Sequence, residues 1–130
     1  MSKEKYTKLT LEGLLAKREQ MLEAKKTPKK ATLYIKSHDA TITVQEPSKQ
    51  VVRDAFEMEG DVSNAYVTRE CCIDPPLKSN ELMEAFGIAD PLDVPDAIFT
   101  HAEVGLIAEA CLKLAGYDPS SVQVVDDIKN

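Results

Sequence analysis

Apolar residues recur at helical spacing near the start of the chain. They fall on one side of a projected helix, and the charged residues between them fall on the other faces. The members of this apolar stripe are Leu11, Leu14, Leu15, Met21 and Leu22. Thr10 has the side chain of a helix N-cap, and the lysines around Pro28 resist continuation of the helix beyond Lys26. The pattern predicts an amphipathic N-terminal helix, followed by a basic linker.

Alternation of apolar and polar residues replaces the helical spacing after the linker. Leu33 and Ile35 alternate with polar neighbours, and Ile42 and Val44 do the same. Residues 37–39 separate the two runs and have the polar character of a turn. Alternation over such short lengths is typical of half-buried strands. These residues therefore predict a small antiparallel β-hairpin.

Helical spacing returns in the second half of the chain and predicts four further helices. Ser48 and Ser79 have side chains that cap helix N-termini, and Gly87 suits the left-handed residue after a helix end. Pro75 and Pro76 stop the helix that precedes them. The predicted helices cover residues 48–58, 63–73, 79–86 and 101–115.

The last predicted helix has the clearest start signal in the chain. Thr100 and Glu103 have the spacing of a capping box, in which each side chain bonds a backbone N–H of the other residue. Gly116 suits the end of the same helix. The face that we expect in the core consists of Val104, Ile107, Ala108, Cys111, Leu114 and Ala115.

These elements place the chain in the α+β class, with mainly α content. We expect a compact helical domain with a small antiparallel β-hairpin and an N-terminal amphipathic helix. Its divisions are a basic N-terminal arm (1–30), a helical body with the hairpin (31–117) and a polar C-terminal tail (118–130). The tail has scattered valines and Ile128, and it is predicted to be either a short extended segment or disordered. At 130 residues the chain has the length of one domain.

Charge is distributed unevenly along the chain. Residues 1–30 contain nine Lys or Arg against four Glu, whereas the other hundred residues carry a net charge of −11. A basic arm on an acidic body can bind an acidic partner or its own surface, or it can be a solvated terminus. An acidic body repels phosphate, so the charge pattern argues against nucleic-acid binding.

The sequence has few residues that are able to perform covalent or acid–base chemistry. The only histidines are His38, in the predicted turn, and His101, at a helix start. Cys71 and Cys72 are adjacent and lack the spacing of a zinc pair, so we expect one in the core and the other partly exposed. Cys111 lies on the predicted core face. We expect reduced thiols, no catalytic residues and no enzymatic activity.

Sites for metals, phosphates and membranes are not indicated either. Asp90, Asp93, Asp96 and the pair Asp126-Asp127 lack the pattern of a calcium loop, and the five glycines are isolated from one another. The longest apolar runs fall far short of the roughly 20 residues that cross a bilayer. We expect no cofactor, no metal and no membrane span.

The order of several sequence blocks resembles that of the XkdN-like phage tail assembly chaperones of phages and prophages of Gram-positive bacteria. The resemblance extends over nearly the whole chain. The blocks are 9–17 (LTLEGLLAK), 41–44 (TITV), 69–77 (RECCIDPPL), 81–87 (ELMEAFG) and 112–117 (LKLAGY).

The resemblance implies a protein of the host cytoplasm that is not part of the mature virion. Such a protein binds the tape measure protein, keeps its long apolar helices soluble and assists polymerisation of the tail tube. In many phages the gene also yields a longer, frameshifted product. The family has no catalytic residues to transfer. From the residues themselves, the apolar stripe of Leu11, Leu14, Leu15, Met21 and Leu22 is compatible with two roles: packing in the protein's own core, or docking on a partner or on a neighbouring copy. We take it as the candidate contact surface.

Two other functions are compatible with parts of the sequence. In the first, the chain is a structural component of a phage tail or capsid, and the same helices are incorporated into the particle. In the second, it is a small nucleic-acid-binding regulator that uses Lys25, Lys26, Lys29 and Lys30. The acidic body argues against the second.

Overall fold

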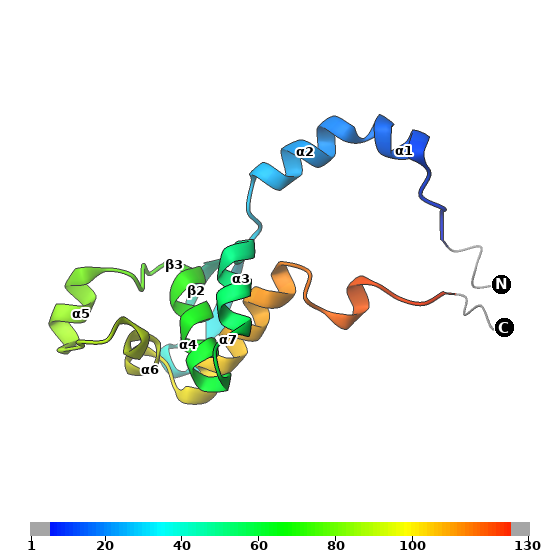
Figure 1. The fold of residues 1–130 in the computed structure, drawn as a ribbon. Coiled ribbons are helices and arrows are strands. Elements are labelled where there is room, and N and C mark those ends of the chain that lie inside the picture. The colour runs from blue at the N-terminus through cyan, green and yellow to red at the C-terminus, as the bar shows by residue number, and fades with distance from the viewer. Residues whose placement is uncertain (1–5, 126–130) are drawn as a thin grey trace. The chain divides into compact units, whose positions relative to one another are not determined.

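A computed structural model describes residues 6–125 of the chain (Figure 1). Contacts divide the chain into two units. One unit is Lys29–Tyr117, and the other combines Met1–Pro28 with Asp118–Asn130. Ile128 and the pair Asp126-Asp127 lie outside the described residues. Each unit is described by itself.

The Lys29–Tyr117 unit contains a three-stranded antiparallel sheet. Strands β1 (Lys30–Ile35), β2 (Ala40–Gln45) and β3 (Cys72–Asp74) follow one another in the order β1-β2-β3. The register of β1 and β2 places Leu33 opposite Ile42. A 3-10 turn (Lys36–His38) and Asp39 join β1 to β2. Asp39 adopts a left-handed conformation with φ 47°, which Asp tolerates better than most residues. The predicted hairpin is confirmed, and it gains a third strand.

Five helices complete this unit, and three of them have the start signals expected from the sequence. Ser48 Oγ accepts from the Val51 N–H, Ser79 caps a helix in the same way, and Thr100 and Glu103 form the expected capping box. Gly87 ends a helix at φ 64°. The helices are α3 (Lys49–Phe56), α4 (Gly60–Cys71), α5 (Asn80–Phe86), α6 (Val94–Ile98) and α7 (His101–Leu114).

The end of α4 differs from the sequence prediction. The helix expected over 63–73 begins earlier and ends at Cys71, and Cys72 turns into an extended conformation. Cys72 then pairs with Val44, and Asp74 pairs with Thr43, at the free edge of β2. The prediction was wrong because this pairing partner lies about thirty residues earlier and overrides the local helical pattern. As a result Cys71 and Cys72 are both buried, although one was expected to be partly exposed.

The core lies where α4 and α7 pack together and where α7 contacts β1 and β2. Val104, Ile107, Ala108 and Cys111 are buried, so the expected core face of the last helix is confirmed for these four residues. Leu77 is fully buried although it belongs to the connection between β3 and α5. Thr68 is buried where α4 meets α7, and its hydroxyl donates to the Val104 carbonyl at 3.1 Å. Its polar group is thereby satisfied inside the core.

The described part of the second unit contains two consecutive short helices, α1 (Leu11–Ala16) and α2 (Arg18–Lys26), and a 3-10 turn at Pro119–Ser121. Thr10 Oγ1 accepts from the Gly13 N–H at 3.0 Å, which confirms the predicted N-cap. The single helix expected here is interrupted at Lys17, whose ψ of 1° departs from helical values. Across residues 6–125, no helix combines the length and apolar character needed to cross a membrane.

Candidate interaction surfaces

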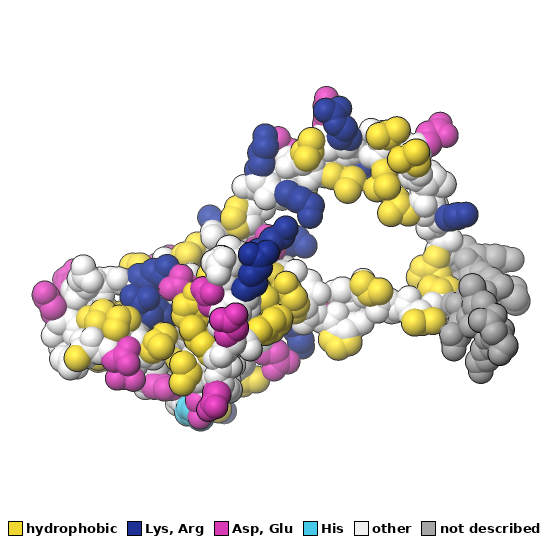
Figure 2. All heavy atoms as spheres, viewed as in Figure 1, with side chains coloured by type: hydrophobic (Ala, Val, Ile, Leu, Met, Phe, Trp, Pro, Cys, Tyr) yellow, Lys and Arg dark blue, Asp and Glu magenta, His cyan; other side chains and the backbone are white. Residues whose placement is uncertain are grey.

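The apolar stripe lies on α1 and α2, and no residue of these helices is buried. The exposed fractions are 73% for Leu11, 63% for Leu15 and 54% for Leu22, with Met21 also exposed and Leu14 partly buried. Figure 2 shows apolar side chains beside charged ones on these two helices. The structure therefore places all five predicted residues on two consecutive helices and leaves most of their apolar surface uncovered.

The interruption between α1 and α2 is confined to one residue. The Lys17 N–H donates to the Gly13 and Leu14 carbonyls, both at 3.2 Å, and the Lys17 carbonyl accepts from the Met21 N–H at 2.9 Å. Backbone hydrogen bonds of helical type thus reach Lys17 from both sides. The stripe is divided into a leucine cluster on α1 and the pair Met21 and Leu22 on α2.

His38 has a structural role in the Lys29–Tyr117 unit. Its Nε2 donates to the Ile98 carbonyl at 2.6 Å, and its ring meets the edge of Phe99 with the centroids 5.8 Å apart. The neighbouring Ser37 donates from its backbone N–H and its hydroxyl to the Glu103 carboxylate, at 3.1 and 2.7 Å. The turn between β1 and β2 is thereby fastened to the junction of α6 and α7.

Glu103 completes this junction through the capping box. Its carboxylate accepts from the Thr100 N–H at 3.0 Å in addition to the two bonds from Ser37. Hydrogen bonds from the Thr100 backbone and then from Ser37 lower the pKa of Glu103 to about 2. A carboxylate that accepts several such bonds is held in its charged form.

His101 lies at the surface and bridges two carboxylates. Its Nε2 is 3.3 Å from Asp61, and its Nδ1 is 3.5 Å from Asp96. All three side chains are largely exposed. Contacts of this kind join the starts of α4, α6 and α7, and they contribute little stability because solvent screens them.

The three cysteines are buried free thiols. A side-chain hydrogen bond between Cys111 and Cys71 lowers the pKa of Cys71 and raises the pKa of Cys111. Burial raises the pKa of Cys72 to about 11, and its Sγ donates to the Pro75 carbonyl at 3.3 Å. Over residues 6–125 the structure contains no group of three or more His, Cys, Asp or Glu placed to hold a metal ion.

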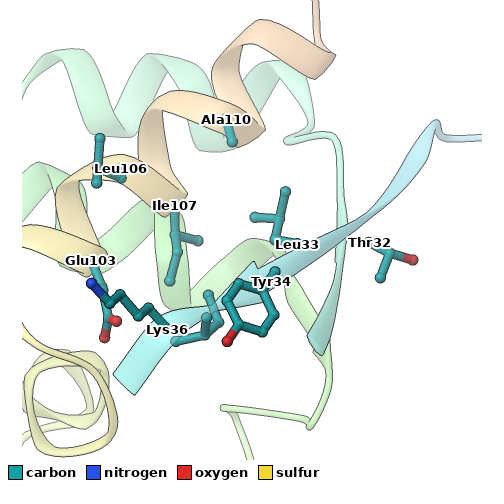
Figure 3. A pocket seen from close by; sticks show the side chains of 9 residues that line it. Thr32, Leu33, Tyr34, Lys36, Glu103, Leu106, Ile107 and Ala110 are labelled. Atoms are coloured by element: carbon teal, nitrogen blue, oxygen red, sulfur yellow. The ribbon is translucent and has the colours of Figure 1, made fainter. Parts of the chain in front are cut away.

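A groove of about 380 Å³ lies between the edge strand β1 and helix α7 (Figure 3). Sequence patterns do not predict this groove, because its two walls are about seventy residues apart in the chain. A signal was nevertheless present, since Leu106 extends the apolar surface of α7 beyond the core face and is 64% exposed. The residues that line the groove are Thr32, Leu33, Tyr34, Ile35, Lys36, Glu103, Leu106, Ile107 and Ala110.

Comparison with known protein families identifies the chain. The model of the Phage XkdN-like tail assembly chaperone protein family matches residues 2–129. The chain belongs to this family. The match covers both units of the structure, including α1 and α2. The resemblance of the sequence blocks to this family is therefore confirmed. No curated protein and no solved structure matches the chain.

Tail assembly chaperones have a non-catalytic role, and the histidines and cysteines of this family member fit that role. His38 fastens a turn, His101 bridges surface carboxylates, and the cysteines pack in the core. Among the described residues, two features suited to contact with other proteins are the apolar stripe on α1 and α2 and the groove between β1 and α7.

Proposed function

We propose that this tail assembly chaperone binds the tape measure protein of its phage, keeps it soluble and assists assembly of the tail tube around it. The observation that supports the proposal is the exposed apolar stripe of Leu11, Leu14, Leu15, Met21 and Leu22 in a member of a tail assembly chaperone family. Its site of action is the host cytoplasm, and the protein is absent from the finished virion.

The physical basis of the proposal is the burial of apolar surface between helices. A long client with apolar helices aggregates unless its apolar faces are covered. An amphipathic helix covers such a face by placing residues at positions i, i+3 and i+4 against it, and Leu11, Leu14 and Leu15 have this spacing. The lysines of α2 and the acidic character of the rest of the chain keep the complex charged and soluble.

Co-expression with the tape measure protein tests the proposal. The client alone is expected in the insoluble fraction, and with the chaperone it should appear in the soluble fraction as a stable complex. Size-exclusion chromatography with light scattering then gives the stoichiometry and shows whether the chaperone also associates with itself. An insoluble client beside a free, folded chaperone would contradict the proposal.

The alternative function is a structural role in the tail or capsid, which also requires exposed apolar helices. Mass spectrometry of purified virions distinguishes the two functions. A structural protein is present in many copies per particle, whereas the chaperone should be absent or present only in traces.

A further inference from the structure

The open edge of β1 has unpaired backbone groups. The Glu46 N–H donates to the Lys29 carbonyl at 2.8 Å, and residues of an antiparallel ladder alternate between bonding their partner strand and facing away from it. Ala31, Leu33 and Ile35 therefore bond toward β2. The N–H and C=O groups of Lys30, Thr32 and Tyr34 face the open edge, where no described residue supplies a backbone partner. Such a row of groups is a template for another strand.

The two edges of the sheet differ in this respect. At the opposite edge, β3 has three residues and is followed by Pro75 and Pro76, which have no N–H to donate. β1 has six residues and contains no proline. Short strands and prolines are common means of blocking an edge, so the sheet is blocked at β3 and open at β1.

Helix α7 supplies an apolar wall beside the open edge. Glu103, Leu106, Ile107 and Ala110 line the groove and follow the spacing i, i+3, i+4 and i+7 of one helical face (Figure 3). A strand that adds to β1 would place alternate side chains against Leu106 and Ala110. At about 3.3 Å per residue β1 is roughly 20 Å long, and α7 has nearly the same length at about 1.5 Å per residue. The groove therefore fits an extended segment of six or so residues.

Charge identifies the kind of segment. Lys29 and Lys30 lie at one end of β1 and Lys36 at the other, and among the described residues none of the three forms an ion pair. Glu103, at the groove itself, accepts three hydrogen bonds from Ser37 and Thr100. The lysines thus favour carboxylates at both ends of the bound segment. They also oppose pairing of two copies of this chain, because each copy would bring three lysines to the same junction.

We propose that the groove between β1 and α7 binds an extended segment of a partner protein as an added antiparallel strand. The segment has apolar residues at alternate positions and Asp or Glu near both ends. Main-chain hydrogen bonds to Lys30, Thr32 and Tyr34 hold it, and its apolar side chains pack on Leu106 and Ala110. This surface belongs to the Lys29–Tyr117 unit alone, so the proposal does not depend on what the apolar stripe of α1 and α2 binds.

A synthetic peptide tests the proposal with the full-length protein. The peptide is about ten residues long, with valine and threonine alternating in its centre and two glutamates at each end. In the proposed arrangement its valines face α7, and its threonine N–H groups donate to β1. The peptide should bind with micromolar affinity. The amide protons of Lys30, Thr32 and Tyr34 should gain protection from hydrogen exchange in the complex, as followed by NMR.

Two methylated peptides form the matched control. Methylation of the threonine nitrogens removes the donors that face β1 and should weaken binding roughly tenfold or more. Methylation of the valine nitrogens removes donors that face away from β1 and should leave binding unchanged. Equal affinities for the two methylated peptides would overturn the proposal, and so would the absence of any binding by the parent peptide.

Substitutions in the protein test the same contacts that the methylated peptides test. Thr32→Pro removes an N–H that faces the open edge without removing a bond to β2, and it should abolish binding. Leu106→Gln is a second variant, in case the proline disturbs the hairpin, and it changes an exposed residue. It should weaken binding of the peptide roughly tenfold. Binding that survives in Leu106→Gln and in a folded Thr32→Pro contradicts the proposal.

A charge exchange tests the chemistry of the partner. The double variant Lys30→Glu with Lys36→Glu should lose affinity for the peptide with glutamate ends and gain affinity for one with lysine ends. Unchanged preference would refute the assignment of an acidic segment. Light scattering of the free protein tests whether a second copy of the chain occupies the groove instead. A dimer that the Thr32→Pro substitution dissociates would show that it does, and would contradict binding of a partner protein.

Discussion

Replacing Leu11 and Leu15 with glutamine tests whether the apolar stripe binds the client. The two side chains are 73% and 63% exposed, so together they offer more than one whole leucine side chain for burial. Full burial of a leucine contributes about 1.5–3 kcal/mol, and the double variant should therefore weaken client binding by about 3 kcal/mol, or roughly a hundredfold. Glutamine has nearly the helix propensity of leucine, so α1 should persist.

Two measurements check this expectation. Co-expression gives the share of tape measure protein that remains soluble, and titration of a labelled client helix by fluorescence anisotropy gives the dissociation constant. The control variant is Val122→Gln with Val124→Gln, which removes two apolar side chains that are 87% and 82% exposed and lie outside α1 and α2. This control should solubilise the client as well as the unchanged protein does.

A double variant that keeps client solubility and affinity, with the same helix content by circular dichroism, would show that the stripe does not bind the client. Equal loss of affinity in the valine control would also contradict the role of the stripe, because general apolar exposure would then matter more than these leucines. The thermal transition of the Lys29–Tyr117 unit provides a further check. Since Leu11 and Leu15 lie outside that unit, the transition should not move.

Three further predictions concern the folded body. Leu77→Ala should lower the free energy of unfolding by about 2–5 kcal/mol in urea titrations, because Leu77 is fully buried; a loss below about 1 kcal/mol would contradict its place in the core. Thr100→Ala should cost about 1 kcal/mol by removing the cap of α7, and an unchanged urea midpoint would contradict that role. The folded-state pKa of Glu103 is lowered from 4.5 to about 2, so its contribution to the free energy of unfolding is present above pH 4.5 and is lost as the pH falls toward 2. Glu103→Gln should therefore weaken the loss of stability in acid. An identical pH dependence of the urea midpoint in the two proteins would refute this role of Glu103.

Local signals in the sequence predicted much of the fold. The caps at Ser48, Ser79 and Thr100 use side chains within three residues of the helix start, and the hairpin alternates over a few residues. The end of α4 could not be found in this way, because Cys72 leaves the helix to pair with Val44. Local propensity is a weak prior where such a distant partner competes.

The two candidate surfaces also differ in how far local sequence patterns predict them. The apolar stripe is a property of one segment and was visible from its periodicity, although the interruption at Lys17 was not. The groove between β1 and α7 lies between distant segments, which a contact from Ser37 to Glu103 joins across 66 positions of the chain. Single-sequence patterns do not encode which distant elements meet, so this surface becomes visible only in the structure.

The location of the core is the reason why we expect changes in the apolar stripe to leave the fold of the Lys29–Tyr117 unit intact. Every described residue of the buried cluster, from Ile35 to Cys111, belongs to the Lys29–Tyr117 unit. No residue of α1 or α2 belongs to this cluster. Apolar side chains that contribute to no core and remain exposed carry a solubility cost, and a binding partner that covers them removes it. We therefore expect the leucines of α1 to serve contact with another protein, and the Leu11 and Leu15 variant tests this expectation.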